Sequence, residues 1–175
     1  MNPHKLALCA VTSALLCALA PIAIPFGAIP ISLATMILYV IASCVEPKIS
    51  LTATVLYIFL GCAGLPVFSG FSGGFQIITG ITGGFLIGYI PCVMITGFLT
   101  RKPETKKFMF PLSMVAGTAV CYICGTAWYI FQTNSPVSVA LTVCVLPFLI
   151  GDAVKIALAS IISVTVRPTL KKILK

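Results

Sequence analysis

Two charged residues near the carboxyl end of the sequence lie inside an apolar segment. Asp152 and Lys155 are the only charged residues of the segment 147–155. Side chains three residues apart share one face of a helix, and each charge would cost about 2.5–3.5 kcal/mol at the centre of a membrane-inserted helix. Two apolar residues would avoid that cost. We interpret the pair as a polar binding site that faces a water-filled cavity, with a structural ion pair that fixes helix packing as the alternative.

A second feature that bears on binding is the glycine- and serine-rich segment 64–77. Glycine permits positive φ and close approach of a backbone to a ligand. Irregular backbone at membrane depth is tolerated only where protein or a water-filled cavity satisfies its polar groups. We therefore expect this segment to be a non-helical outer loop at a ligand cavity, with Phe68, Phe71 and Phe75 closing over an apolar ligand. A flexible extracellular loop is the alternative.

Motifs for catalysis are absent from the sequence. It contains no G-x-x-x-x-G-K-[ST] phosphate-binding loop, and His4, the single histidine, lies outside the apolar segments. We therefore predict no enzymatic activity, no ATP hydrolysis by this chain and no metal site. Cys121 and Cys124 form a C-x-x-C without a nearby acidic residue or histidine. The eight cysteines are interpreted as small packing residues of apolar helices.

The composition indicates which elements must position these residues. Hydrophobic residues make up 59% of the chain, charged residues 8%, and the mean hydropathy is +1.16. Soluble domains carry about 25% charged residues, so residues 1–175 are predicted to be a single all-α integral membrane domain. A spanning helix needs about 20 mostly apolar residues. A six-transmembrane-helix bundle is predicted, with helices at Lys5–Ile22, Ile29–Val45, Ile49–Ala63, Ile78–Thr100, Phe108–Phe131 and Leu146–Val166. Between the last two, the segment 132–145 is a candidate short outer helix.

The basic residues predict the orientation of the bundle. With a cytoplasmic amino terminus, one side of the membrane collects Lys5, Lys48, Arg101, Lys102, Lys106, Lys107, Arg167, Lys171, Lys172 and Lys175. The loops on the other side contain no Lys or Arg. Cytoplasmic loops carry an excess of basic residues, so both termini are predicted to be cytoplasmic and the protein to be a multi-pass protein of the cytoplasmic membrane. Because these charges lie in short clusters between apolar runs, the net charge of +8 does not indicate nucleic-acid binding.

The amino-terminal segment also resembles a signal peptide, with Ala18-Leu19-Ala20 as a nominal cleavage site. Pro21 directly after that site disfavours cleavage, so we expect a retained helix.

Small residues at four-residue spacing let helices approach closely in lipid. They occur as Gly80, Gly84 and Gly88, as Ser113, Gly117, Cys121 and Gly125, and as Ala10, Ala14 and Ala18. We expect the first two stripes to pack inside the bundle. For the alanine stripe, internal packing and docking of another membrane protein remain open.

At three stretches the sequence resembles the BioY family, the biotin-specific substrate-binding (S) components of energy-coupling-factor (ECF) transporters. These are residues 64–70 with the following Gly73-Gly74, residues 82–88, and Gly151-Asp-Ala-Val-Lys155. The resemblance extends over essentially the whole chain. It implies a six-helix membrane fold with an outward-facing ligand cavity, and it implies a transmembrane coupling subunit and two ATPases as partners.

The resemblance also implies roles for particular residues. Asp152 and Lys155 correspond to the family's ligand-binding Asp and Lys on the last helix. Ser72 stands where the family's outer loop often has Asn before its paired glycines. Ala10, Ala14 and Ala18 correspond to the stripe associated with docking to the coupling subunit.

Biotin fits such a site chemically, because it combines ureido N–H donors and a carbonyl with an apolar ring and a carboxylate. We expect Asp152 to accept from a ureido nitrogen and Lys155 to donate to the ureido oxygen. Ser72, Gly73, Gly74 and Gln76 would meet the other end of the ligand. Pairing of Lys155 with the biotin carboxylate is the alternative assignment.

Three other functions remain open at this point. A self-sufficient secondary transporter or channel would use Asp152 as its ion site, although no internal repeat of the kind typical of such proteins is evident. An S component for thiamin or riboflavin would share the fold. A membrane scaffold would have no ligand.

Overall fold

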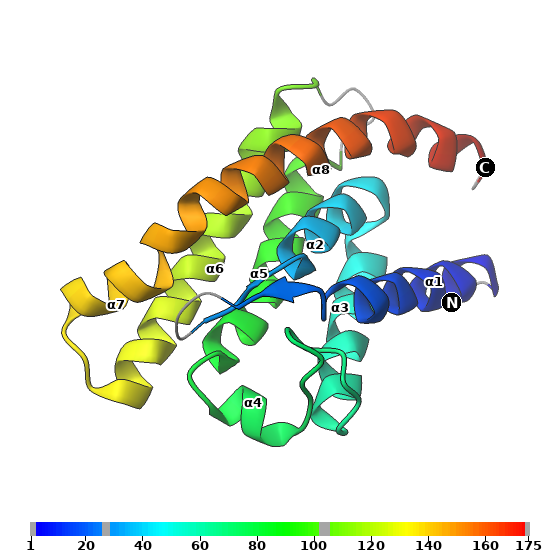
Figure 1. The fold of residues 1–175 in the computed structure, drawn as a ribbon. Coiled ribbons are helices and arrows are strands. Elements are labelled where there is room, and N and C mark those ends of the chain that lie inside the picture. Colours follow the sequence, from blue (N-terminus) through cyan, green and yellow to red (C-terminus); the bar gives the residue numbers. More distant parts are fainter. Residues whose placement is uncertain (1–2, 26–28, 102–105, 174–175) are drawn as a thin grey trace.

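The computed structural model describes residues 3–25, 29–101 and 106–173 and is mostly helical (Figure 1). Lys102, Glu104 and Lys175 lie outside the described residues. The helices are α1 (Pro3–Leu19), α2 (Ala34–Cys44), α3 (Pro47–Cys62), α4 (Phe75–Thr79), α5 (Gly83–Leu99), α6 (Met109–Thr133), α7 (Val137–Cys144) and α8 (Leu146–Ile173), and two short strands, β1 (Ala23–Ile24) and β2 (Ile31–Ser32), follow α1.

The segment between α1 and α2 differs from the sequence prediction. The helix predicted at Lys5–Ile22 ends at Leu19, and the helix predicted from Ile29 begins only at Ala34. Ala23 pairs with Ser32 and Ile24 with Ile31 in an antiparallel ribbon. Pro25 and Pro30 flank the connection between the two strands, and proline in a helix interior costs an intrahelical hydrogen bond. The chain therefore satisfies its backbone there by strand pairing.

The segment predicted as one helix from Ile78 to Thr100 is divided into two. The five-residue helix α4 ends at Thr79, and α5 starts at Gly83. The prediction that residues 64–77 contain no regular helix is wrong at their end, because α4 begins at Phe75. Gly74 has a φ of 102° immediately before α4, a conformation that glycine adopts readily.

The remaining predicted helices are present with shifted ends. α3 spans Pro47–Cys62 where Ile49–Ala63 was predicted, and α6 ends two residues later than predicted. α8 continues past the predicted Val166 to Ile173. The short helix considered for residues 132–145 is present as α7.

Two helical segments among the described residues are long and apolar enough to cross a bilayer by length and composition: Met109–Thr133, and Val137–Leu170, which joins α7 to α8. Four shorter apolar helices accompany them: Pro3–Leu19, Ala34–Cys44, Pro47–Cys62 and Gly83–Leu99.

The packing of α5 against α6 confirms internal packing for Gly84 and Gly88 and for the stripe on α6, whereas Gly80 lies in the connection between α4 and α5. A side chain at Gly84 would overlap Trp128, and one at Gly125 would overlap Phe85. A Cβ on Gly88 would lie 3.2 Å from the Cα of Cys121. The two backbones therefore approach closely, and α5 and α6 pack more extensively than any other pair of helices in the described chain.

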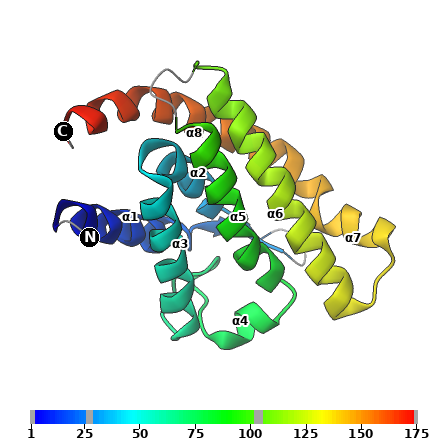
Figure 2. The ribbon, with the colours of Figure 1, turned by 180° about the vertical axis from the view of Figure 1, so that it is seen from behind.

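The arrangement of elements separates the chain ends from α4 and α7. The two ends lie near each other on one side of the molecule, and α4 and α7 lie away from them (Figures 1 and 2). Near the amino-terminal end, Lys5 forms an exposed ion pair of 2.9 Å with Glu46, which precedes α3. At the corresponding end of α8, Arg167 donates to the backbone oxygen of Thr100 and lies over the ring of Phe110.

Candidate ligand-binding site

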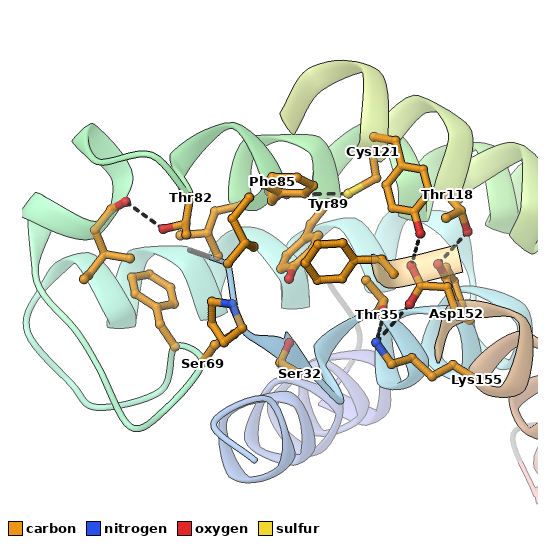
Figure 3. Close-up of a pocket in the computed structure, with 18 of the residues that line it drawn as sticks. Ser32, Thr35, Ser69, Thr82, Phe85, Tyr89, Thr118, Cys121, Asp152 and Lys155 are labelled. Atoms are coloured by element: carbon orange, nitrogen blue, oxygen red, sulfur yellow. Dashed lines mark hydrogen bonds and ion pairs between the residues drawn. The ribbon is translucent and has the colours of Figure 1, made fainter. Parts of the chain in front are cut away.

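A cavity of about 220 Å³ lies between α2, α5, α6, α8 and the loop 64–74 (Figure 3). Most of its surface is apolar or aromatic, with a limited number of polar groups. Its lining residues are Ile29, Pro30, Ser32, Thr35, Tyr39, Phe68, Ser69, Ser72, Ile77, Thr82, Phe85, Leu86, Tyr89, Thr118, Cys121, Tyr122, Phe148, Asp152 and Lys155. A concave, mainly apolar pocket with a few convergent polar groups is the usual form of a small-molecule site.

Asp152 and Lys155 both line this cavity, as the interpretation of a cavity-facing pair requires. Lys155 Nζ lies 2.9 Å from Asp152 Oδ1, and the side chains are only 10% and 6% exposed. Lys155 Nζ also donates to Thr35 Oγ1 of α2 at 3.3 Å. The ammonium group therefore links α8 to α2, so the pair fixes packing as well as presenting charge to the cavity. The two interpretations that the sequence left open are compatible.

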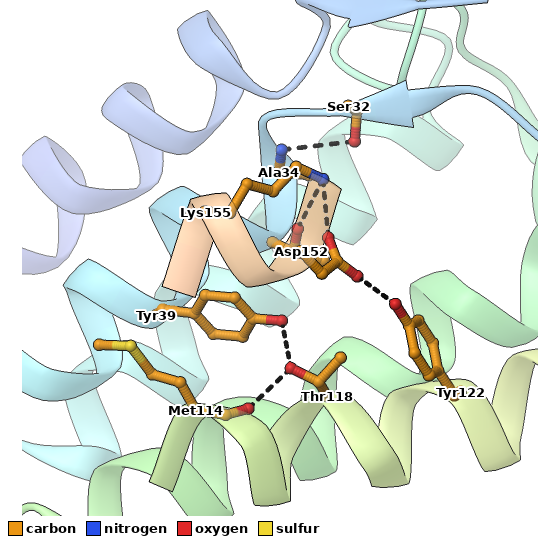
Figure 4. A network of polar contacts seen from close by, with 9 residues as sticks. Ser32, Ala34, Tyr39, Met114, Thr118, Tyr122, Asp152 and Lys155 are labelled. Carbon is orange, nitrogen blue, oxygen red and sulfur yellow. Dashed lines mark hydrogen bonds and ion pairs between the residues drawn. The ribbon is translucent and has the colours of Figure 1, made fainter. Parts of the chain in front are cut away.

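A tyrosine from α6 holds the second oxygen of Asp152. Tyr122 donates its hydroxyl hydrogen to Asp152 Oδ2 at 2.6 Å (Figure 4). Hydrogen bonds of this length to an ionised acceptor are among the stronger ones in proteins. Since Lys155 occupies the other oxygen, Asp152 is held from α6 and from its own helix, and its orientation is fixed before a ligand enters.

A second pair of hydroxyls lies close to this group. Tyr39 of α2 and Thr118 of α6 are 2.6 Å apart through their oxygens, and Thr118 also donates to the backbone oxygen of Met114 (Figure 4). Thr118 therefore accepts from Tyr39. Both residues line the cavity, so its charged end carries two further hydroxyl groups.

Sequence reasoning missed Tyr122, Tyr39 and Thr118. A usable signal was present, because buried tyrosine hydroxyls usually require a hydrogen-bond partner and Tyr39, Tyr89 and Tyr122 lie in three different apolar segments. Which of them would meet Asp152 depends on the relative rotation of helices, and this cannot be read from periodicity.

The predicted loop residues divide into two groups. Ser72 lines the cavity, whereas Gly73, Gly74 and Gln76 are not among its lining residues. The exposed side chain of Gln76 donates back to the oxygen of Gly73 at 3.1 Å. The backbone of Gly74 donates to Gly61 O at 2.7 Å. In this structure these three residues shape the loop, and direct contact with a ligand stays a prediction for them.

The three loop phenylalanines also behave differently from one another. Phe68 is buried, packs edge-on against Tyr57 at 5.6 Å and lines the cavity. Its ring occupies the space that a side chain on Gly61 would need. Phe71 and Phe75 are exposed. Phe68 is therefore a fixed wall of the site in this structure, while the other two point away from it.

The two ends of the cavity differ in chemistry and in burial. Asp152, Lys155 and Thr118 lie at one end, Phe85 and Tyr89 in the middle, and Ser69 and Thr82 toward the other end (Figure 3). The charged end is buried, and Ser69, Ser72 and Thr82 at the loop end are half-buried. The cavity therefore suits an elongated molecule with a polar, hydrogen-bonding head and an apolar body.

The alanine stripe of α1 lies on the surface. Ala10, Ala14 and Ala18 are exposed, while Thr12 and Leu16 on the opposite face are buried. α1 packs mainly on α3 and α2. Internal packing within the described chain therefore does not account for the stripe.

Comparison with known proteins identifies related transporters. The model of the BioY family matches residues 1–172. The biotin transporter BioY of Thermotoga maritima is 32% identical over 146 residues, which are 83% of this chain and 85% of the relative. The biotin transporter BioY2 of Lactococcus lactis subsp. cremoris is 29% identical over 158 residues, or 90% of this chain and 87% of the relative. Among solved structures, the S-component for biotin from an ECF-type ABC transporter superposes with a TM-score of 0.87 at 26% identity, covering 96% of this chain and 95% of that chain.

Proposed function

The chain belongs to the BioY family, and from this membership we propose that it captures biotin outside the cell and delivers it inward as the S component of an ECF-type transporter. It is a transport protein and not an enzyme. The observation that supports the ligand most directly is the buried Asp152–Lys155 pair in a largely apolar cavity.

The chemistry of the cavity accommodates the ureido head at its charged end. Asp152 retains acceptor capacity for a ureido N–H, since an ionised carboxylate has about four lone-pair positions and the described contacts use two. Lys155, with three donor hydrogens, faces the ureido oxygen. The apolar ring system would lie against Phe85 and Tyr89, and the valeryl chain would extend toward Ser72.

Membership of the family supports a proposal about the partners. An S component has no ATPase of its own, so a transmembrane coupling subunit and two ATPase subunits would supply the energy for release. The exposed stripe of Ala10, Ala14 and Ala18 would be the surface at which α1 meets the coupling subunit. Small residues allow such close helix contacts in lipid.

We further propose that α1, α2, α3, α5, α6 and α8 cross the cytoplasmic membrane, with both termini inside and the loop 64–74 outside. α2 has 11 residues, a length of about 16 Å against a hydrocarbon core of about 30 Å. The segment 29–33, which contains β2, would complete this crossing. Its non-helical backbone borders the cavity, where such backbone is tolerated.

Calorimetry on the purified chain in detergent tests the ligand. Biotin is expected to bind once per chain without ATP, because binding precedes energisation. Absence of a biotin signal together with a signal for thiamin or riboflavin would replace this proposal with a related vitamin carrier. A secondary transporter would instead take up biotin in vesicles that contain this chain alone, and collapse of the ion gradient would abolish that uptake.

A further inference from the structure

The lining of the cavity has no net charge and carries its only ion pair at one end. Among the described residues that form the wall, Lys155 is the only cation and Asp152 the only anion. Residues 26–28, which adjoin the lining residue Ile29 and fall outside the described part, are Phe, Gly and Ala. The cation is already engaged, because Lys155 contacts both Asp152 and Thr35. Asp152 balances the charge of Lys155, so the described wall offers no net positive charge to an anionic ligand group.

Two hydroxyl groups at the loop end already donate hydrogen bonds within the protein. Ser72 donates its hydroxyl to the backbone oxygen of Ser69 at 2.9 Å, and Thr82 donates to the backbone oxygen of Ile77 at 3.4 Å. An oxygen that has given its hydrogen away can only accept. A carboxylate needs donors, so these two side chains do not form an anion site as they are arranged.

A ligand carboxylate at this end would meet no cation of the described wall and, of the three hydroxyls there, only that of Ser69 could donate to it, so it would keep most of its water. Burying an unpaired charge is far more costly than burying a hydrogen-bonded polar group. The loop-end residues Ser69, Ser72 and Thr82 are half-buried, unlike Asp152 and Lys155. A carboxylate at this end would remain hydrated, and the site would not sense whether it is charged.

We propose that this protein recognises the ureido head and apolar body of biotin but not the charge of its tail, so that its substrates include neutral tail derivatives such as biotin amides and esters. This inference rests on the proposed binding of biotin with its head at Asp152. It names the substrate class that this particular cavity would accept.

Biotin and its primary amide form the matched pair of ligands, since they have almost the same size and differ in charge at neutral pH. Both are titrated by calorimetry into the purified full chain. We expect the two affinities to agree within tenfold, the equivalent of about 1.4 kcal/mol. A loss of more than tenfold on amidation overturns the inference, because the site would then read the carboxylate. If that loss disappears in Lys155→Met, the carboxylate lies at Lys155 and the head is at the loop end.

Installing a cation at the loop end provides the converse measurement. Ser72→Lys is expected to favour biotin over the amide by more than tenfold, because the tail would gain an ion pair. Leu65→Lys is the matched control, as it adds the same charge on an exposed side chain of the same loop outside the cavity wall. The ratio of biotin affinity to amide affinity in Leu65→Lys should stay at the wild-type value. If the ratio is unchanged in Ser72→Lys, the inference is overturned. If Ser72→Lys binds neither ligand, Ser69→Lys is measured in its place.

The two proposals fail in different ways. If biotin itself does not bind, the proposed function is wrong. If biotin binds and the amide does not, only the inference about the charge of the tail is wrong.

Discussion

Asp152 is held by two donors that come from different directions. Tyr122 reaches it from α6 at 2.6 Å and Lys155 from the next turn of α8 at 2.9 Å. The side chain is therefore already oriented in the folded protein, before a ligand N–H reaches it. Preorganisation of this kind raises affinity by lowering the cost of binding.

Asp152→Asn is expected to weaken biotin binding by about 100-fold. The change removes a charged acceptor and leaves the Lys155 ammonium without its counterion, and hydrogen bonds to charged groups contribute about 1.5–3 kcal/mol. Calorimetry on the purified variant measures the loss. Glu46→Gln serves as the control, because it removes a carboxylate from the exposed pair with Lys5 and should leave affinity unchanged. If Asp152→Asn binds biotin within threefold of the wild-type affinity, the Asp152 carboxylate does not contact the ligand.

Tyr122→Phe is expected to weaken biotin binding by about tenfold, because one hydrogen bond that orients Asp152 is lost. A double-mutant cycle shows whether Tyr122 acts through Asp152. In the Asp152→Asn background, the same substitution should cost less than twofold. Equal losses in both backgrounds would mean that the phenol touches the ligand directly or only supports packing. Tyr129→Phe, two turns further along α6 and outside the cavity wall, provides the matched control.

The contact between Asp152 and Lys155 could be predicted from the sequence, whereas their contacts with other helices could not. The spacing of Asp152 and Lys155 on one helix predicted their proximity, because both belong to a single regular element. The contacts of Asp152 with Tyr122 and of Lys155 with Thr35 join residues 30 and 120 positions apart. They arise from the packing of separate helices, which hydropathy does not encode.

At the scale of the elements, apolar composition identified the helices but misplaced their starts. Residues 29–33 are as apolar as the helix that follows, so hydropathy extended α2 across β2. The same reasoning joined α4 to α5 across Gly80, although the indole of Trp128 donates to the Gly80 oxygen at 2.9 Å. That contact satisfies a backbone group that a continuous helix would have used internally. Both errors border the cavity, where irregular backbone is useful for binding.

The close approach of α5 to α6 leads to a prediction about stability. Gly84→Ala is expected to lower the stability of the folded protein by about 1–3 kcal/mol, the usual cost of overpacking, because the added methyl would overlap Trp128 and the backbone of Cys124. Thermal unfolding in detergent measures the effect.

Gly151→Ala is the matched control for this change. Its methyl would meet only Ile31 at 3.7 Å, an ordinary contact, and glycine is a poor helix former. Its melting temperature should stay at or above that of wild type. A Gly84→Ala protein as stable as Gly151→Ala would contradict the tight packing of α5 on α6.

At the scale of the whole molecule, one side carries the chain ends, and the loop 64–74 and α4 lie away from them. Lys5 of α1 pairs with Glu46, the residue before α3, so the first turns of these two helices lie together. The class of the fold could be predicted because composition alone excludes a soluble domain. The number of crossings could not be predicted from length alone, because α2 has 11 residues and a spanning helix needs about 20.

The proposed docking of the coupling subunit at the exposed alanine stripe leads to a prediction about uptake. Because Ala10, Ala14 and Ala18 lie on the free face of α1, away from the cavity wall, docking and ligand capture should be separable. Ala14→Trp is expected to reduce biotin uptake by cells that contain the complete transporter by more than tenfold, because the large ring prevents close helix contact. Biotin binding to the purified chain should remain within twofold of wild type.

Ala127→Trp tests whether any bulky residue on a lipid-facing helix has the same effect. Ala127 is an exposed alanine on α6, so this variant places the same ring on another part of the surface. Uptake should persist in Ala127→Trp and fail in Ala14→Trp, and co-purification with the coupling subunit should show the same difference. If both variants transport normally, the α1 face contacts only lipid, and another surface of the bundle must receive the coupling subunit.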